Sequence, residues 1–179
     1  MSDREVLIGV TGGIAAYKVA ALVSQLVQSG ISVSVAMTAA AEKFVGRATF
    51  AALTGRPVAV SAFDSNGFPL GAHITLAEQA DLYCVAPATA DFLSKAAHGA
   101  ADDLVSTLYL SVTSPVLMAP AMNCEMWASV AVQRNVAQLA DDGVHLVGPE
   151  EGWLSCRKQG FGRMAPPETI FAAIQQLLK

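Results

Sequence analysis

The residues with the clearest chemical potential lie near predicted helix starts and in one long loop. His73 follows Gly71-Ala72, where an imidazole could act as an acid or base near neutral pH, cap a helix, or simply face solvent. Cys156 lies in the polar, glycine-flanked segment Cys156–Met164, which suits a reactive thiol better than the strand interior that holds Cys84. These two side chains are therefore candidates for catalysis.

Two further segments directly follow predicted strands. They read Pro87-Ala88-Thr89-Ala90-Asp91-Phe92 and Pro120-Ala121-Met122-Asn123-Cys124-Glu125-Met126-Trp127. A Pro-Ala step often only begins a helix, and the methionines and the tryptophan could equally be core residues. Because ligands of doubly wound folds bind at the carboxyl ends of strands, both segments are also candidate binding sites.

A glycine-containing turn connects the first predicted strand to the first predicted helix. It reads Gly9-Val10-Thr11-Gly12-Gly13-Ile14-Ala15-Ala16-Tyr17-Lys18. Glycines here let the main chain approach a phosphate, and the helix N-terminus supplies free N–H groups, although a tight turn alone would also need glycine. The spacing is neither GxGxxG nor a Walker A loop, and the second predicted strand ends in Met37-Thr38-Ala39-Ala40, without an acid for a dinucleotide ribose. The pattern favours a mononucleotide, and FMN is the obvious candidate.

These segments need a framework, and the sequence predicts one in which strands alternate with helices. Strands are predicted over residues 6–10, 31–37, 57–60, 82–86, 116–119 and 144–147, and helices over 14–28, 39–53, 73–79, 89–97, 103–110, 129–140 and 168–178. The pattern predicts an α/β, flavodoxin/Rossmann-like three-layer fold with a mostly parallel sheet, formed by one domain over residues 1–179. Residues 64–71 are predicted as a turn-rich loop, and 148–167 as a long loop of the kind that usually either forms a functional lid or is disordered.

Composition excludes several classes of protein. The 179 residues are 53% apolar and 15% charged with a net charge of −4, and no Lys/Arg cluster indicates nucleic-acid binding. The three cysteines form no CxxC pair, so neither a disulfide framework nor a metal site is expected. No apolar run is long enough to span a membrane and the N-terminus lacks signal-peptide features, which predicts a cytoplasmic protein. The apolar composition also favours a homo-oligomer.

Taken together, the motifs resemble the flavin-containing cysteine decarboxylases, and within that family the branch that acts on phosphopantothenoylcysteine in coenzyme A biosynthesis. The resemblance covers nearly the whole chain. It rests on Gly12-Gly13-Ile14-Ala15-Ala16-Tyr17-Lys18, His73-Ile74-x-Leu76-Ala77, Pro87-Ala88-Thr89-Ala90, Ala101-Asp102-Asp103-Leu104, Pro120-Ala121-Met122-Asn123-x-x-Met126-Trp127, and Cys156 with Gly160-x-Gly162-Arg163-Met164. The Pro-x-Met-Asn-x-x-Met-Trp string is highly specific, and the loop with Cys156 narrows the resemblance to the coenzyme A branch.

The resemblance implies FMN-dependent decarboxylation of 4′-phosphopantothenoylcysteine to 4′-phosphopantetheine. It implies that His73 is the active-site base, that Asn123 holds the substrate carboxylate, and that Cys156 donates a proton. It also implies homotrimers or multiples of trimers, with flavin and substrate between subunits, so that His73 and Asn123 could come from different chains. The implied FMN site comprises Gly12, Gly13, Ile14, Thr38, Thr89, Ala90, Asp91, Phe92 and Ala121, and the implied substrate site adds Met126, Gly162, Arg163 and Met164 to Asn123.

The chemistry explains why such a reaction needs a flavin. Direct loss of carbon dioxide from a cysteine carboxylate would leave an unstabilised carbanion. Oxidation of the thiol to a thioaldehyde places the carboxylate β to a C=S group, and decarboxylation then gives a delocalised enethiolate. A flavin can accept the hydride and return it afterwards, so the overall reaction is that of a lyase without net redox change.

Three alternatives share parts of this pattern. A peptide decarboxylase of lantibiotic-type biosynthesis would use His73, Asn123 and FMN but would not need Cys156. A non-catalytic flavin-binding regulatory subunit would usually carry an acidic tail, and a prenyl-flavin-making transferase would not need the Pro-Ala-Met-Asn string together with Cys156.

The sequence departs from the family pattern at two places. Asp91 stands where asparagine is usual, and His98-Gly99 replaces the usual Asn-Gly step. If the Asp91 side chain faces the flavin or a contact between subunits, its buried carboxylate would be costly, and we expect it there to be protonated or to find a cation.

Overall fold

A parallel five-stranded sheet forms the centre of the computed structural model, which describes residues 4–63, 68 and 71–179. The strand order is β2-β1-β3-β4-β5, the doubly wound order in which the direction of winding reverses between β1 and β3. The strands are β1 (Glu5–Val10), β2 (Ser32–Met37), β3 (Leu82–Ala88), β4 (Val116–Pro120) and β5 (His145–Leu146).

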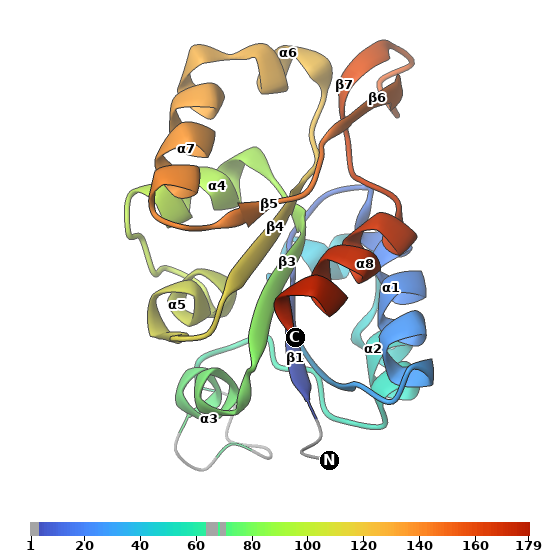
Figure 1. Ribbon diagram of the computed structural model, residues 1–179, viewed down its shortest axis with the longest axis vertical. Helices are drawn as coiled ribbons and strands as arrows, with labels where there is room; N and C mark the ends of the chain where they lie inside the picture. Colours follow the sequence, from blue (N-terminus) through green and yellow to red (C-terminus); the bar gives the residue numbers. More distant parts are fainter. Residues whose placement is uncertain (1–3, 64–67, 69–70) are drawn as a thin grey trace.

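Helices cover both faces of this sheet and complete the predicted three-layer fold (Figure 1). One face carries α1 (Ala16–Gln28), α2 (Arg47–Thr54) and α8 (Pro167–Leu177). The other carries α3 (Ala72–Gln79), α4 (Ala90–Ala97), α5 (Leu104–Ser111) and α7 (Val130–Asp141). The short α6 (Cys124–Ala128) follows β4 and precedes α7.

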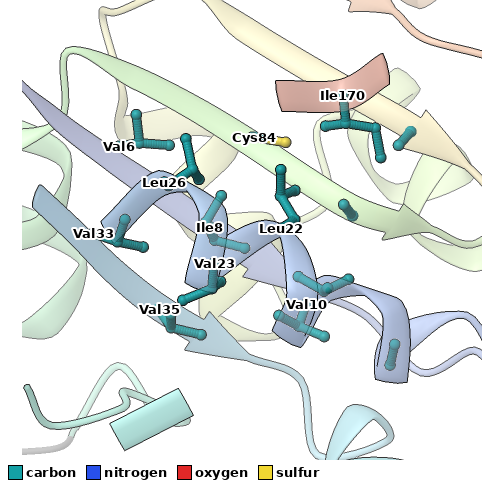
Figure 2. Close-up of a cluster of buried hydrophobic side chains, with 14 of the residues drawn as sticks. Val6, Ile8, Val10, Leu22, Val23, Leu26, Val33, Val35, Cys84 and Ile170 are labelled. Atoms are coloured by element: carbon teal, nitrogen blue, oxygen red, sulfur yellow. The ribbon is translucent and has the colours of Figure 1, made fainter. Parts of the chain in front are cut away.

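The strands are buried because helices pack on both of their faces. In α1, apolar side chains at i, i+3, i+4 and i+7 form one stripe that faces the sheet. Figure 2 shows this stripe packed against alternate residues of β1 and β2, with Cys84 of β3 and Ile170 of α8 closing the layer. Burial raises the pKa of the Cys84 thiol, which agrees with a purely structural role for this cysteine.

Three predicted elements differ from the structure, namely the helix over residues 39–53, the strand over 57–60 and the loop over 148–167. The predicted helix over residues 39–53 is wrong as a continuous element, because extended backbone at Gly46 separates a 3₁₀ turn, η1 (Ala41–Lys43), from α2. The predicted strand over residues 57–60 is reduced to an isolated bridge between Ala59 and Ala36. The predicted loop over residues 64–71 lies largely outside the described residues, which omit 64–67 and 69–70.

The third difference bears on the site. The segment predicted as a loop over residues 148–167 contains an antiparallel hairpin of β6 (Glu150–Trp153) and β7 (Gln159–Arg163), which projects beyond the sheet in Figure 1. Cys156 lies at the tip of this hairpin. The prediction of a loop is therefore wrong for these two strands, because main-chain pairing gives the hairpin a defined shape.

None of the helices in the described ranges is both long enough and apolar enough to cross a lipid bilayer.

Candidate functional site

A cavity of about 1090 Å³ lies where β1, β3 and β4 end, and the β6–β7 hairpin forms one of its walls. This is the position at which open α/β sheets bind ligands, beside the β1/β3 switch point. The cavity brings together all of the predicted site residues except His73. Its walls contain Gly12, Gly13, Ile14, Thr38, Thr89, Ala90, Asp91, Phe92, Ala121, Asn123, Met126, Cys156, Gly162, Arg163 and Met164.

The glycine turn after β1 packs directly against the loop after β2. A Cβ at Gly12 would lie only 2.4 Å from the Cβ of Ala40, so a larger residue would separate the two loops. Within the described chain, the main-chain N–H groups of Gly12, Ile14, Ala39 and Ala40 donate no hydrogen bond. Such free amides at a helix N-terminus are the donors that a phosphate requires, so the turn fits the phosphate of a mononucleotide.

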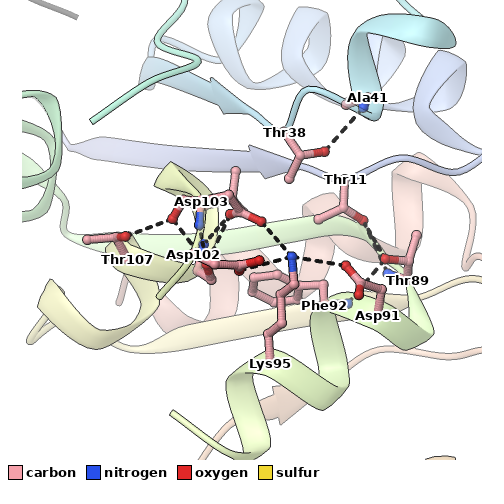
Figure 3. A network of polar contacts seen from close by, with 12 residues as sticks. Thr11, Thr38, Ala41, Thr89, Asp91, Phe92, Lys95, Asp102, Asp103 and Thr107 are labelled. Carbon is pink, nitrogen blue, oxygen red and sulfur yellow. Dashed lines mark hydrogen bonds and ion pairs between the residues drawn. The ribbon is translucent and has the colours of Figure 1, made fainter. Parts of the chain in front are cut away.

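Thr11 joins the end of β1 to the end of β3. Its hydroxyl donates to the carbonyl of Pro87 at 2.6 Å and accepts from the N–H of Thr89 at 3.2 Å. Thr89 in turn caps α4 by accepting from the N–H of Phe92 at 3.3 Å (Figure 3). The loops that follow β1 and β3 are thus held in a fixed relation. The sequence analysis did not single out Thr11, although its position just before the glycines is a signal that could have indicated it.

Lys95 of α4 is the centre of an acidic cluster at one wall of the cavity. Its ammonium lies 3.0 Å from both Asp102 and Asp103 and 3.3 Å from Asp91 (Figure 3). Partial burial alone would lower the pKa of Lys95, but the hydrogen bonds to Asp102 and Asp103 outweigh it and hold the pKa above its usual value. The Asp91 carboxylate is largely exposed and pairs with Lys95, so the buried, unpaired carboxylate considered in the sequence analysis does not occur within this chain.

Asp103 also fixes the start of α5. Its carboxylate accepts from the N–H of Ser106 at 2.8 Å, and the Ser106 hydroxyl faces the N–H of Asp103 in return, which forms a capping box. Lys95 therefore ties α4 to the first turn of α5. Neither Lys95 nor Asp103 was predicted as part of the site.

Asn123 caps the short helix α6, and this role fixes the orientation of its side chain. The Oδ1 atom accepts from the N–H of Met126 at 2.7 Å. Because the amide oxygen is used in this way, the Nδ2 group is left as a donor in the cavity that Asn123 lines. A ligand carboxylate is the natural acceptor for such a group.

The hairpin packs closely against the segment that follows β4. The N–H of Met122 donates to the carbonyl of Gly162 at 2.9 Å, and a Cβ at Gly162 would lie 2.3 Å from the carbonyl oxygen of Met122. Gly162 also has a φ of +138°, which L side chains rarely adopt. On the hairpin itself, Arg163 pairs with Glu150 at 3.0 Å. The glycine-rich sequence of β7 thus permits a close approach that no other residue type would allow.

An ion pair draws the hairpin tip onto α6. The Lys158 ammonium contacts the Glu125 carboxylate and holds the pKa of Glu125 at about 2. The Cys124 thiol donates to the same carboxylate at 3.2 Å, and this hydrogen bond to Glu125 raises the pKa of Cys124. The Lys158–Glu125 ion pair therefore anchors the tip that carries Cys156 to α6.

His73 does not join the cavity within one chain. It lies at the start of α3, and Figure 1 places α3 near the opposite end of the sheet from the hairpin. Its Nδ1 atom is buried and has no hydrogen-bond partner among the residues that the structure describes. Over the same residues, no group of three His, Cys, Asp or Glu side chains is placed to hold a metal ion.

The comparison with family models matches the flavoprotein family over residues 1–179. This chain belongs to the flavoprotein family. Among curated relatives, this flavoprotein is 45% identical over 170 residues to the coenzyme A biosynthesis bifunctional protein CoaBC of Bacillus subtilis, covering 95% of this chain and 42% of the relative. It is also 45% identical over 176 residues to CoaBC of Mycobacterium tuberculosis, covering 98% of this chain and 42% of the relative. The chain thus spans less than half of the length of these relatives.

Two solved structures of similar proteins share the fold of this flavoprotein. The FMN-dependent cysteine decarboxylase SpaF is 35% identical, with a TM-score of 0.85 and 99% of each chain covered. A mutant PPC decarboxylase in complex with pantothenoylaminoethenethiol is 26% identical, with a TM-score of 0.87 and 97% of each chain covered.

Proposed function

We propose that this flavoprotein is a carboxy-lyase that uses FMN to convert 4′-phosphopantothenoylcysteine to 4′-phosphopantetheine in coenzyme A biosynthesis. The observation that carries the proposal is that Asn123 and Cys156 line the same cavity as the glycine turn after β1. The names of the CoaBC relatives and the ligand of the solved PPC decarboxylase support this choice of substrate. We further propose that residues 1–179 form one catalytic unit that works in the cytoplasm.

The residues of the cavity fit FMN. The unpaired amides of the glycine turn and of the loop after β2 would hold the phosphate, and the Thr89–Phe92 segment with Ala121 would line the ring system. Bound FMN would supply reversible two-electron chemistry, accepting a hydride from the carbon that bears the thiol and returning it after decarboxylation.

The protein's own side chains orient the substrate and move protons. The Nδ2 group of Asn123 donates to the substrate carboxylate, and the cap on α6 keeps that group from rotating. The Cys156 thiol, held at the hairpin tip, donates a proton to the enethiolate carbon at the end of the cycle. This last role favours full turnover over the release of an enethiol, as a peptide decarboxylase would do.

We propose that His73 acts as the base from a neighbouring subunit of a homotrimer or a multiple of trimers. Support comes from its distance from the cavity in one chain and from exposed apolar side chains around the cavity mouth, where Ile14 is 56% and Tyr17 60% exposed. Such surfaces usually contact another molecule.

A mixing experiment tests the shared site. His73→Ala and Asn123→Ala proteins, each inactive alone, should regain activity when they are unfolded and refolded together, because some sites then combine an intact His73 with an intact Asn123. Random assembly predicts intact sites in about a quarter of positions. If His73 and Asn123 act within one chain, the mixture stays inactive.

The carboxylate contact is tested by Asn123→Asp. Aspartate keeps the acceptor that caps α6, so α6 and FMN binding should survive, but it replaces the amide donor with a negative charge. We expect kcat/KM to fall by about 100-fold or more, since a hydrogen bond to a charged group is lost and repulsion is added. Turnover of this variant at the wild-type rate would rule out the assigned role.

A further inference from the structure

The cations near the cavity differ in whether a carboxylate neutralises them. Lys95 contacts three carboxylates, Arg163 pairs with Glu150, and Lys158 at the hairpin tip contacts a carboxylate on α6. Lys18 also lines the cavity. Among the residues that the structure describes, none forms an ion pair or a hydrogen bond with its ammonium.

The position of Lys18 in α1 is electrostatically unfavourable in the absence of a ligand. It is the third residue of the helix, and the first turn contains no acidic residue to balance it. A cation at a helix N-terminus is opposed by the positive end of the helix dipole. An anion bound beside this turn would remove that repulsion, because it would contact both the ammonium and the free N–H groups.

The charge of the ligands also requires a cation. Under the proposed function, the cavity accepts one phosphomonoester from FMN and one from the substrate, together with the substrate carboxylate. The Lys95 cluster carries more negative than positive charge, and the Arg163 pair is neutral. Within the described part of the cavity wall, Lys18 is thus the only cation that no carboxylate already compensates.

We propose that the Lys18 ammonium binds a phosphomonoester in this cavity and so makes the protein prefer a phosphorylated ligand to its dephosphorylated form. For the substrate the inference rests on the proposed function, whereas for the cofactor it requires only flavin binding. The two phosphomonoesters share the same chemistry, and separate measurements distinguish them.

The experiment compares Lys18→Met with Lys18→Arg and with Lys43→Met. Lys43 is an exposed lysine outside the cavity, so its substitution controls for the loss of one positive charge. Dissociation constants are measured by titration of flavin-depleted protein with FMN and with riboflavin, and of flavin-loaded protein with 4′-phosphopantetheine and with pantetheine. We expect Lys18→Met to weaken one phosphorylated ligand by about 10- to 100-fold and to leave its dephosphorylated partner unchanged. Lys18→Arg should retain most of the affinity.

The pattern of losses decides the assignment. A loss confined to FMN places Lys18 at the cofactor phosphate, and a loss confined to 4′-phosphopantetheine places it at the substrate phosphate. If both ratios of phosphorylated to dephosphorylated affinity match those of Lys43→Met, the proposal is overturned. Because all four readouts are binding constants, they remain decisive even if the wild-type protein fails to turn over 4′-phosphopantothenoylcysteine, a result that would count against the proposed function alone.

Discussion

Substitution of Gly162 by alanine should detach the β6–β7 hairpin from the rest of the site while leaving the sheet intact. Two features of the structure determine how much free energy of hairpin docking the substitution removes. The φ of +138° at Gly162 is unfavourable for any residue with a Cβ, and the new Cβ would lie 2.3 Å from the carbonyl oxygen of Met122. Relief of that contact requires the two segments to separate, which breaks the 2.9 Å hydrogen bond from the N–H of Met122 to the carbonyl of Gly162.

The magnitude follows from these two terms. Backbone strain of this kind costs about 1–3 kcal/mol. The lost hydrogen bond adds about 1 kcal/mol. A total of about 2–4 kcal/mol would shift the equilibrium between docked and detached hairpin by about 30- to 1000-fold. Gly143→Ala is the matched control, because Gly143 has a φ of +88° but no atom within 4 Å of the Cβ position, so this variant has only the backbone strain.

Hydrogen exchange of the native protein is the assay. In Gly162→Ala the N–H of Met122 should exchange about 30- to 1000-fold faster, as the shift in the docking equilibrium requires. The N–H of Ile8 in β1 should keep its protection. FMN should remain bound, and kcat/KM should fall because Cys156 is no longer held over the substrate. Unchanged protection at Met122, or the same change in Gly143→Ala, would refute the reasoning about close approach.

Three further predictions concern charged groups around the site. Lys158 holds the pKa of Glu125 at about 2, below its ordinary value of 4.5. The Glu125 carboxylate therefore stabilises the docked hairpin fully above pH 4.5 and loses this contribution as the pH falls through about 2. Tryptophan fluorescence should show a transition near that pH in the wild type and none in Glu125→Gln. Glu125→Gln also removes the hydrogen bond to the Glu125 carboxylate that raises the pKa of Cys124. Alkylation of Cys124 by iodoacetamide at pH 8, followed by mass spectrometry, should therefore become several-fold faster. An unchanged rate would contradict the statement that this hydrogen bond raises the pKa. Asp91→Asn removes one of three carboxylates from Lys95 at an exposed position, so urea denaturation should show a change below about 1 kcal/mol, and a larger loss would mean that the pair is structurally required.

Most of the fold could be predicted because local patterns and tertiary structure agree in it. The buried strands β1 and β3 are largely continuous apolar segments, and the first helix ends at residue 28 as predicted, shortly before Gly30 with its φ of +83°. The glycine turn could be located for the same reason, since Gly12 lies at a strand end and permits a close contact with Ala40. In each case a single segment contained the information.

The parts that escaped prediction depend on contacts between distant segments. The hairpin strands contain glycines and charged residues without clear alternation, and their shape depends on docking against Met122. The i,i+4 spacing of Asp91 and Lys95 could have indicated one ion pair, but Asp102 and Asp103 reach Lys95 only after the turn at Gly99. His73 lies outside the cavity of its own chain, and under the proposed function a second copy of the chain would bring it to the substrate.

The mass of the product formed from 4′-phosphopantothenoylcysteine tests the central claim most directly. The account predicts a product lighter than the substrate by one carbon dioxide, with no other change, from the wild-type protein with bound FMN. Cys156→Ser should instead release a product that also lacks two hydrogens, because the enethiol is not protonated and reduced. Substrate recovered unchanged from flavin-loaded wild-type protein would contradict the account.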